Sequence, residues 1–591
     1  MNKQLNRLCE TFWVKLGISI IITGIFFFII YCTSPVVFFI NDDENIMYTL
    51  AGYYTNGIPG DHSFVNYLLG RGISTLYSWL PSVPWYGVFH VMVLFTSITA
   101  IGYTILKESS VRKLLPILAV CLFACITLLC FTFPVTLMQF TVTSAIAGTA
   151  AVALLLAGGA GNSILSVVFM VLCYLHRKNT GNVILCFYAL TAAYQFLRNL
   201  LKKKQEKLNI SGMSVLKPVI ALVLAVACIF GCVFISESVV RTTDEWDAFY
   251  EYDEARFKVT DYDHDSFSEN PEMYEQMGWT ASLYRLSCSG FLFFMDERIN
   301  ADSFNTISAT GYQSTDSSLK ECVDNFIKLI TGETQAMICL VLIMVLFLLV
   351  ALLSIKNIKK LWLEVLLAEG AVLGAGVMIL YLCWKGRFIL RAFQTIAYPT
   401  IVILAIVLLR VMGAIMTKKP GKPAIIVGSV LLLVAGLVTV NFGHGLMAES
   451  RELAHSRQVK SNRTHAVEEY AIENPENMYI YDTSLTFRYS PFVTYVDAYP
   501  SNVSYWGGMG WNSPTLLDQA EQNGIDKMQS DIFFRDDVYY VSYSGYTTGN
   551  GTPIKDVFMD YMAETYGDVT IKLVDSITPE IGVYKVHKIG K

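Results

Sequence analysis

The stretch GISIIITGIFFFIIYCTSPVVFFINDDE, residues 17–44, passes from 24 predominantly apolar residues through Asn41 into three acidic ones. A helix that crosses a membrane needs about 20 such apolar residues, so residues 17–40 predict a first span. The run is too long for a signal peptide and has no small-residue cleavage site, so we expect the helix to be retained. Asp42, Asp43 and Glu44 then stand at the predicted lipid–water boundary, where burying a carboxylate is costly.

The composition of the whole chain indicates that the protein has many membrane-spanning helices and not only the first. Of its 591 residues, 53% are hydrophobic and only 16% are charged, against about 25% charged in soluble domains. The mean hydropathy is +0.45. The net charge of −5 shows no excess of basic residues for a nucleic-acid partner. These values predict a polytopic α-helical membrane protein.

Apolar segments of spanning length recur along the first three quarters of the chain, and we expect about eleven transmembrane helices. They are predicted at residues 17–40, 84–106, 114–133, 137–157, 163–176, 182–200, 214–236, 336–354, 361–383, 392–411 and 423–441.

The basic residues of short loops predict the orientation, because such loops favour the cytoplasm. With the N-terminus inside, four predicted inside loops are basic: 107–113, 201–207, 355–360 and 412–422. The outer face then receives the loop 41–83, the loop 237–333 and a C-terminal domain. We therefore divide the chain into a membrane domain, 1–441, and an extracytoplasmic domain, 442–591.

The C-terminal segment predicts a small α/β domain. Helices are expected at 447–471, 513–522 and 554–566, and strands at 478–482, at 538–543 and twice near the end. Cys288 and Cys322 are the only cysteines of the 237–333 loop, and a disulfide between them is left open.

The first predicted outer loop resembles that of GT-C-fold membrane glycosyltransferases, which include protein O-mannosyltransferases and aminoarabinose transferases. In that superfamily a first span ends in Asp-Glu, an aromatic-rich helix follows, and an Asp-His-Pro-Pro sequence comes next. Here Asp43-Glu44 is followed by Tyr48 and, 18 residues after Asp43, by Asp61-His62, with Ser-Phe in place of Pro-Pro.

The resemblance implies a glycosyltransferase of the hexosyltransferase type. Such an enzyme transfers a sugar from a polyprenyl-phosphate donor to a glycan, lipid or protein acceptor on the outer face. An acid of the first loop is then the general base. Asp61 and His62 belong to the second motif.

The chemistry of a carboxylate at this boundary agrees with that role. An acceptor hydroxyl must lose its proton as it attacks the anomeric carbon, and partial desolvation raises a carboxyl pKa toward the useful range. Asp43 is the preferred base and Asp42 the alternative, while Glu44 tunes the charge or binds a metal ion. A single base with no second carboxylate as nucleophile predicts inversion. The alternative is that the acids only solvate a helix end.

A lipid-phosphate donor also needs cations on the outer face. Two short predicted outer loops are basic, although basic residues usually gather in the cytoplasmic loops. Arg387 and Arg391 are four residues apart, so on a helix they would share a face. Arg71 of the first loop is a further candidate, with headgroup anchoring as its alternative. Lipid headgroup contact is also the alternative for the two basic loops. Their residues are His176, Arg177 and Lys178 in one loop and Lys385, Arg387 and Arg391 in the other.

The aromatic stretch 499–514 contains Trp506 and Trp511 among glycines and asparagines. Aromatic faces beside small residues suit stacking on sugar rings, so we predict an acceptor-recognition loop. The alternative is a loop that docks the C-terminal domain onto the membrane domain.

Three other functions stay open at this point: a transporter or flippase of a lipid-linked saccharide, a glycan polymerase or ligase, and a receptor or assembly protein whose outer face binds a partner without catalysis. A transporter would carry ionisable residues near the middle of the membrane, and few are found there. No ligand set for a metal is assigned, and a divalent cation is left open as a cofactor. An outer-face enzyme without a eukaryotic retention signal suggests a bacterial cytoplasmic membrane and, by association, cell-wall polysaccharide.

Overall fold

The computed structural model describes most of the chain. It covers residues 12–52, 65–108, 115–205, 212–240, 244–289, 296–311, 318–386, 388–415, 422–485, 490–493, 500–505, 514–525, 529–548 and 551–589.

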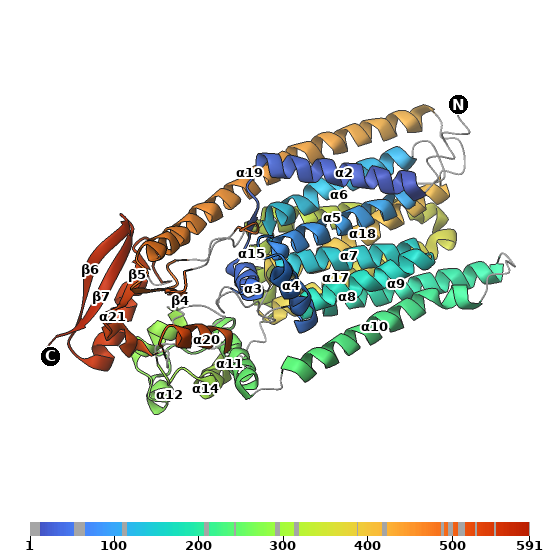
Figure 1. The fold of residues 1–591 in the computed structure, drawn as a ribbon. Coiled ribbons are helices and arrows are strands. Elements are labelled where there is room, and N and C mark those ends of the chain that lie inside the picture. Colours follow the sequence, from blue (N-terminus) through green and yellow to red (C-terminus); the bar gives the residue numbers. More distant parts are fainter. Residues whose placement is uncertain are drawn as a thin grey trace.

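Long apolar helices form a bundle, and each of the eleven predicted spans falls on one of them (Figure 1). The first helix ends at Thr33 and not at residue 40, because Pro35 disfavours helical geometry at the residue before it. The helices are α2 (Phe12–Thr33), α5 (Trp85–Lys107), α6 (Leu115–Thr136), α7 (Phe140–Ala157), α8 (Ala160–His176), α9 (Lys178–Gln205), α10 (Gly212–Val240), α16 (Thr334–Ser354), α17 (Ile358–Trp384), α18 (Leu390–Ile415) and α19 (Lys422–Glu473).

The described residues contain 8 helical stretches that are long and apolar enough to cross a membrane. One of these, Thr334–Trp384, includes both α16 and α17, whereas α8 is a shorter apolar helix. The architecture is therefore that of a polytopic membrane protein, and the exact number of eleven spans stays a prediction.

The segments outside the predicted spans gather at one end of the bundle. Figure 1 shows α3, α4, α11, α12 and α14 there, beside the C-terminal sheet and opposite the start of α2. This placement agrees with a single face for the three predicted outer segments, while the side of the membrane stays a prediction. The elements at this end are α3 (Asn41–Ala51), α4 (Tyr67–Trp79), α11 (Asp244–Thr260), α12 (Pro271–Gln276), α13 (Ala281–Tyr284), the π-helix η2 (Arg285–Ser289), α14 (Ala301–Gly311) and α15 (Leu319–Gly332). The short η3 (Ile355–Asn357) instead connects α16 to α17, in the predicted inside loop 355–360.

The C-terminal region contains a five-stranded sheet of order β4-β3-β5-β7-β6. The pairs of β3 with β4 and with β5 are parallel, and the pairs of β7 are antiparallel. Every helix and strand predicted for this region is present. Its elements are β3 (Met478–Tyr481), β4 (Val503–Tyr505), α20 (Pro514–Gln522), η4 (Ser530–Phe534), β5 (Val538–Tyr543), α21 (Ile554–Tyr566), β6 (Val569–Thr578) and β7 (Ile581–Lys588).

Helix α19 connects this sheet region to the bundle. It runs for 52 residues and passes through the predicted domain boundary at 441/442 without a break. The boundary itself stays a prediction.

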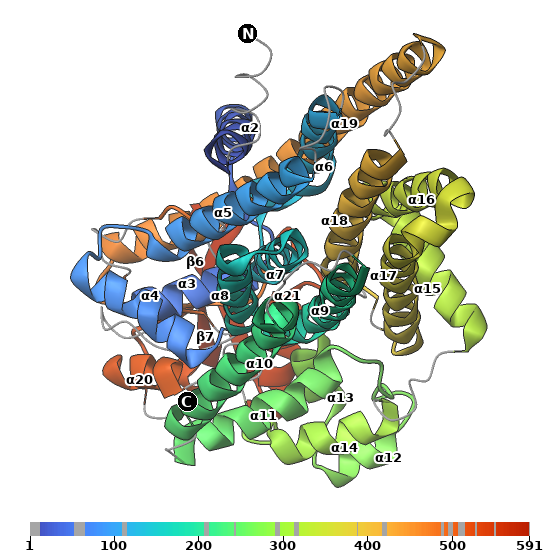
Figure 2. The same cartoon turned by 90° about the vertical axis from the view of Figure 1, so that its right-hand side faces the viewer.

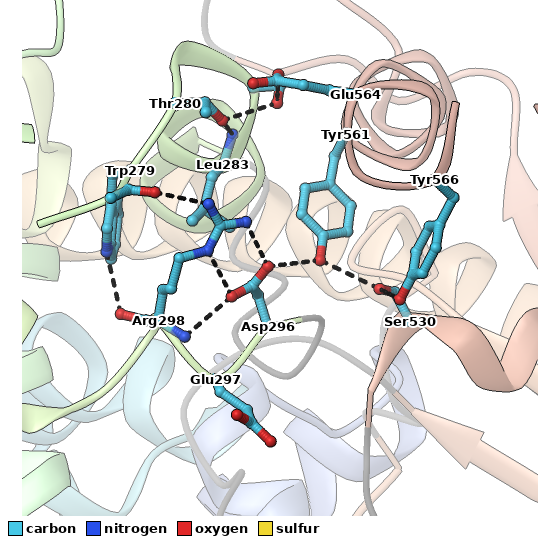
Figure 3. Close-up of polar contacts among 12 residues, drawn as sticks. Trp279, Thr280, Leu283, Asp296, Glu297, Arg298, Ser530, Tyr561, Glu564 and Tyr566 are labelled. Carbon is cyan, nitrogen blue, oxygen red and sulfur yellow. Dashed lines mark hydrogen bonds and ion pairs between the residues drawn. The ribbon is translucent and has the colours of Figure 1, made fainter. Parts of the chain in front are cut away.

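Side-chain hydrogen bonds join the sheet region to the helical segment 244–311, as Figure 3 shows. The Tyr561 hydroxyl donates to Asp296 Oδ2 at 2.8 Å, and Asp296 also pairs with Arg298 at 2.6 Å. Ser530 lies within 3.1 Å of the Tyr561 hydroxyl, and Ser282 donates to Glu564. In the same segment Cys288 is a free thiol, so the disulfide with Cys322 does not form here.

Helix α7 lies near the centre of the bundle (Figure 2), where α5, α8, α9 and α18 pack around it. Its residues 140–156 are all buried, so the unpaired carbonyls at its C-terminal end need protein partners. Lys107 Nζ donates to the carbonyls of Ala157 and Gly158 at 2.8 and 3.1 Å. Arg410 Nη2 donates to the Leu156 carbonyl at 2.7 Å.

A buried ion pair holds Arg410 in this position. Its Nε and Nη2 atoms donate to the two carboxylate oxygens of Glu108 at 3.0 and 2.7 Å, and Nη1 donates to the Tyr194 hydroxyl at 3.0 Å. The bidentate geometry ties α18 to the end of α5 and to α9.

We expect Arg410→Gln to destabilise the protein by about 3–5 kcal/mol, because Glu108 keeps its charge in a buried place without its partner. The measurement is the midpoint of thermal unfolding in detergent. Lys359→Gln, at an exposed residue of α17, is the control and should leave the midpoint unchanged. Equal midpoints for both variants would show that the pair contributes little.

Candidate active site at the N-terminus of α7

Two very short strands determine where the site forms. Strand β1 (Val37–Phe38) pairs in parallel with β2 (Leu137–Met138), and the Phe39 N–H donates to the Met138 carbonyl at 2.8 Å. Helix α3 begins three residues after β1, and α7 begins two residues after β2. Since the strands are parallel, the N-terminal ends of these two helices lie side by side.

Asp43 bridges the two helices. Its Oδ1 accepts a hydrogen bond from the Phe140 N–H, the first residue of α7, at 2.8 Å, and from the Tyr86 hydroxyl at 3.1 Å. The residue that precedes α7, Gln139, makes no side-chain cap. Asp43 therefore caps a helix almost 100 residues away in the sequence.

The second carboxylate oxygen of Asp43 is available for chemistry. It is buried and has no hydrogen-bond partner among the described residues. Burial, and then the charge of Asp42, raise the pKa of the Asp43 carboxyl well above its usual range, while the bonds from Tyr86 and Phe140 and the charge of Arg391 act in the opposite direction. A carboxyl of this kind is a candidate for proton transfer.

A histidine and a tyrosine of α5 surround Asp43, and neither is singled out by the sequence. His90 Nε2 lies 3.6 Å from Asp43 Oδ1, and its Nδ1 lies 3.0 Å from Thr143 Oγ1 on α7. Tyr86 and His90 are four residues apart, so they share a face of the helix. This spacing of two polar aromatic residues within an apolar span is the signal that could have identified them.

Two of the predicted phosphate-binding arginines act on Asp42 through their charges. It is half-buried, and burial raises the pKa of its carboxyl, while Arg391, Arg177 and Arg256 lower it through their charges. The guanidinium of Arg177 lies 4.9 Å from the ring centroid of Phe140. Arg177 follows α8 and Arg391 is in the first turn of α18, so the fold brings residues from three distant segments together.

The other predicted residues of the two basic loops have different environments. His176 is fully buried, with its ring 5.0 Å from that of His90, whereas Lys178 is exposed at the start of α9. Lys385 follows α17 and its Nζ lies 5.0 Å from the Trp384 ring. Helix α18 begins at Leu390, with Arg391 in its first turn. Arg387 lies outside the described residues, so the expectation that it shares a helix face with Arg391 stays a prediction.

The remaining predictions are only partly within the described chain. Glu44 is buried on α3 and Arg71 is exposed on α4. No group of three or more His, Cys, Asp or Glu side chains in the described ranges is arranged to hold a metal ion. Five predicted site residues lie outside the described residues: Asp61, His62, Arg387, Trp506 and Trp511.

Comparisons with known proteins find similarity among the solved structures. No protein-family model and no curated protein matches the sequence. The chain is similar to the crystal structure of ArnT from Cupriavidus metallidurans bound to undecaprenyl phosphate, with 97% of each chain covered, 11% sequence identity and a TM-score of 0.46. The described residues form the helical bundle with a C-terminal sheet region that was expected from the sequence.

The raised pKa of Asp43 predicts a specific dependence of stability on pH. The folded protein binds this proton more tightly than the unfolded chain, so the stabilisation is fully present below the unfolded pKa of about 3.9 and is lost as the pH rises through the folded pKa. Asp43→Asn keeps an oxygen acceptor and does not titrate. Its unfolding midpoint should therefore rise relative to the parent protein as the pH increases above about 4.

Thermal unfolding of both proteins over a series of pH values tests this. Asp302→Asn, at an exposed residue of α14, is the control and should follow the parent protein. A difference between Asp43→Asn and the parent that is constant with pH would contradict a raised folded pKa.

Proposed function

We propose that this protein is a membrane glycosyltransferase that moves a sugar from a polyprenyl-phosphate-linked donor to a hydroxyl group of an acceptor at the outer face. The observation that carries the proposal is the combination at the N-terminus of α7. A buried carboxylate, Asp43, lies there beside Asp42, whose charge interacts with Arg177 and Arg391. The first-loop motif Asp43-Glu44 points to the same reaction.

Asp43 acts as the general base in this proposal. Its Oδ1 is held by the Phe140 N–H and the Tyr86 hydroxyl, which leaves Oδ2 to take the proton of the acceptor hydroxyl. The acceptor oxygen then bonds to the anomeric carbon as the bond from that carbon to the phosphate oxygen breaks. The phosphate leaves with the electron pair, and direct displacement inverts the configuration.

Arg177 and Arg391 bind the donor phosphate. Guanidinium groups suit this task because they hold phosphate oxygens through two parallel hydrogen bonds. In this proposal the leaving phosphate is bound close to the base, because the charges of both arginines act on Asp42, the neighbour of Asp43, and the sugar carbon lies between the phosphate and the base. Lys178 is exposed and follows Arg177 in the sequence, so it adds positive charge beside this arginine.

Structural capping is the competing role for Asp43, since it holds the N-terminus of α7 whatever the reaction. An asparagine at residue 43 keeps an acceptor oxygen for both hydrogen bonds but cannot take a proton. This substitution therefore separates the two roles.

The first test is sugar transfer in proteoliposomes from a panel of polyprenyl-phosphate sugars. We expect Asp43→Asn to lower kcat by about 10²–10⁴-fold, which is the usual contribution of a general base, with an unchanged KM for the donor. Asp42→Asn should lower kcat less, and Asp302→Asn should match the parent protein. The opposite order of the two site variants would assign the base to Asp42.

The outcome that rejects the enzyme is also specific. If no donor reacts but a labelled lipid-linked saccharide crosses the bilayer, the protein is a transporter or flippase. Transfer with products of many added units would instead identify a polymerase.

The arginines predict a separate effect on donor binding. Arg391→Gln or Arg177→Gln should raise the KM for the donor on the order of 10–100-fold, because a hydrogen bond to a charged group contributes about 1.5–3 kcal/mol. The lysine variants should recover part of this loss, since lysine supplies charge without the bidentate fork. Lys320→Gln, at an exposed residue of α15, is the control; an equal change in KM there would indicate general electrostatic attraction.

A further inference from the structure

Two buried histidines lie behind the proposed base. His90 of α5 and His176 of α8 are fully buried, and their rings contact edge to face at a centroid distance of 5.0 Å. Nε2 of His90 and both ring nitrogens of His176 have no hydrogen-bond partner in the part of the chain that the structure describes. Buried polar atoms are rarely left in this state in a merely packed interior.

The orientation of His90 is determined by its neighbours. Thr143 Oγ1 lies 3.0 Å from Nδ1, which directs the opposite nitrogen, Nε2, toward Asp43 Oδ1 at 3.6 Å. The ring also packs against Tyr86, at 4.6 Å between centroids, and Phe38, at 6.0 Å. When Nδ1 carries the hydrogen and donates it to Thr143, Nε2 presents a lone pair to the carboxyl group.

Asp43 needs a neighbour that can accept a proton if it is to act as a base in successive reaction cycles. Its burial favours the neutral acid, so a proton taken from an acceptor would remain on it. A nearby imidazole can accept that proton, and the resulting carboxylate and imidazolium stabilise each other. Two groups this close titrate as a pair.

We propose that His90 is a positioning residue that takes from Asp43 the proton that Asp43 removes from the acceptor. This inference rests on the proposed function. The acceptor O–H bond breaks and the proton joins Asp43 Oδ2. That carboxylic acid then loses its proton and an N–H bond forms at His90 Nε2. The proton finally leaves with the released phosphate monoester, whose second pKa is about 6.

The titratable and hydrogen-bonding groups that face His90 come from four elements. Asp43 on α3 is the partner, Tyr86 lies on the same helix as His90, Thr143 is on α7 and His176 is on α8. Beyond these, Asp42 and Arg391 act on Asp43 through their charges, and Arg177 is next in sequence to His176. A change in the pH dependence therefore has to be assigned with variants.

The kinetic test uses His90→Gln in proteoliposomes with whichever donor reacts. Gln keeps a polar side chain near Thr143 but cannot carry a proton. We expect kcat to fall on the order of 10–100-fold with the donor KM unchanged, and activity to recover as the pH is raised, because Asp43 must then lose its proton to solvent. His444→Gln, at an exposed residue of α19, is the control. A fall in kcat with the parent's pH profile would overturn the proposal.

A substrate-free test separates this inference from the proposed function. Infrared spectroscopy follows the carbonyl band of protonated Asp43, which is identified by its loss in Asp43→Asn. In the parent protein this band should disappear at a lower pH than in His90→Gln, because the imidazolium stabilises the carboxylate. The same midpoint in both proteins would overturn the proton transfer to His90, whether or not a sugar is transferred.

Discussion

The structure depends on the burial of α7 and on how its two ends are satisfied. A helix that is enclosed along its length cannot leave its terminal N–H and C=O groups to water, so other elements must supply partners. Asp43 meets this need at the N-terminal end through the Phe140 N–H. Lys107 and Arg410 meet it at the other end through the carbonyls of residues 156–158. The polar residues at the two ends thus fix the helices around α7.

The need to satisfy both ends of α7 also explains why the two ends differ. The candidate site lies at the N-terminal end, and a buried ion pair lies at the C-terminal end. At the C-terminal end Arg410 and Glu108 form a bidentate pair, so the charges are compensated within the protein. At the N-terminal end Asp43 has one oxygen bonded and the other without a partner among the described residues. Two cationic side chains, Arg177 and Arg391, lie close enough to act on the neighbouring Asp42. One end is closed by an internal pair, whereas the other is the end at which we propose that the donor binds.

Much of the architecture could be predicted from the sequence because apolar length and charge position are local signals. The helices of the bundle, the acids after the first span and the elements of the C-terminal sheet region followed from such signals. The pairing of β1 with β2 could not be predicted, because two residues in each strand carry too little pattern to define a contact across 100 positions. The cap that Asp43 makes on α7 depends on that pairing.

The sequence also could not predict the roles of single polar residues within apolar helices. His90 is one histidine in an apolar span, which by itself is typical of a packed core residue. Only its distance to Asp43 suggests a part in proton transfer. His176 was assigned to an exposed basic loop, but α9 begins only two residues later and the ring is buried. Phosphate binding by Arg177 and Arg391 stays a prediction, and that both act through their charges on Asp42 became visible only in the fold.

The most direct test of the central claim is a cryo-electron microscopy structure in lipid nanodiscs with a non-hydrolysable polyprenyl-phosphate sugar. The account predicts that the phosphate lies between Arg177 and Arg391, with the anomeric carbon facing Asp43 and Asp42. A phosphate bound elsewhere in the bundle, with these acids and arginines making no contact to it, would contradict the account.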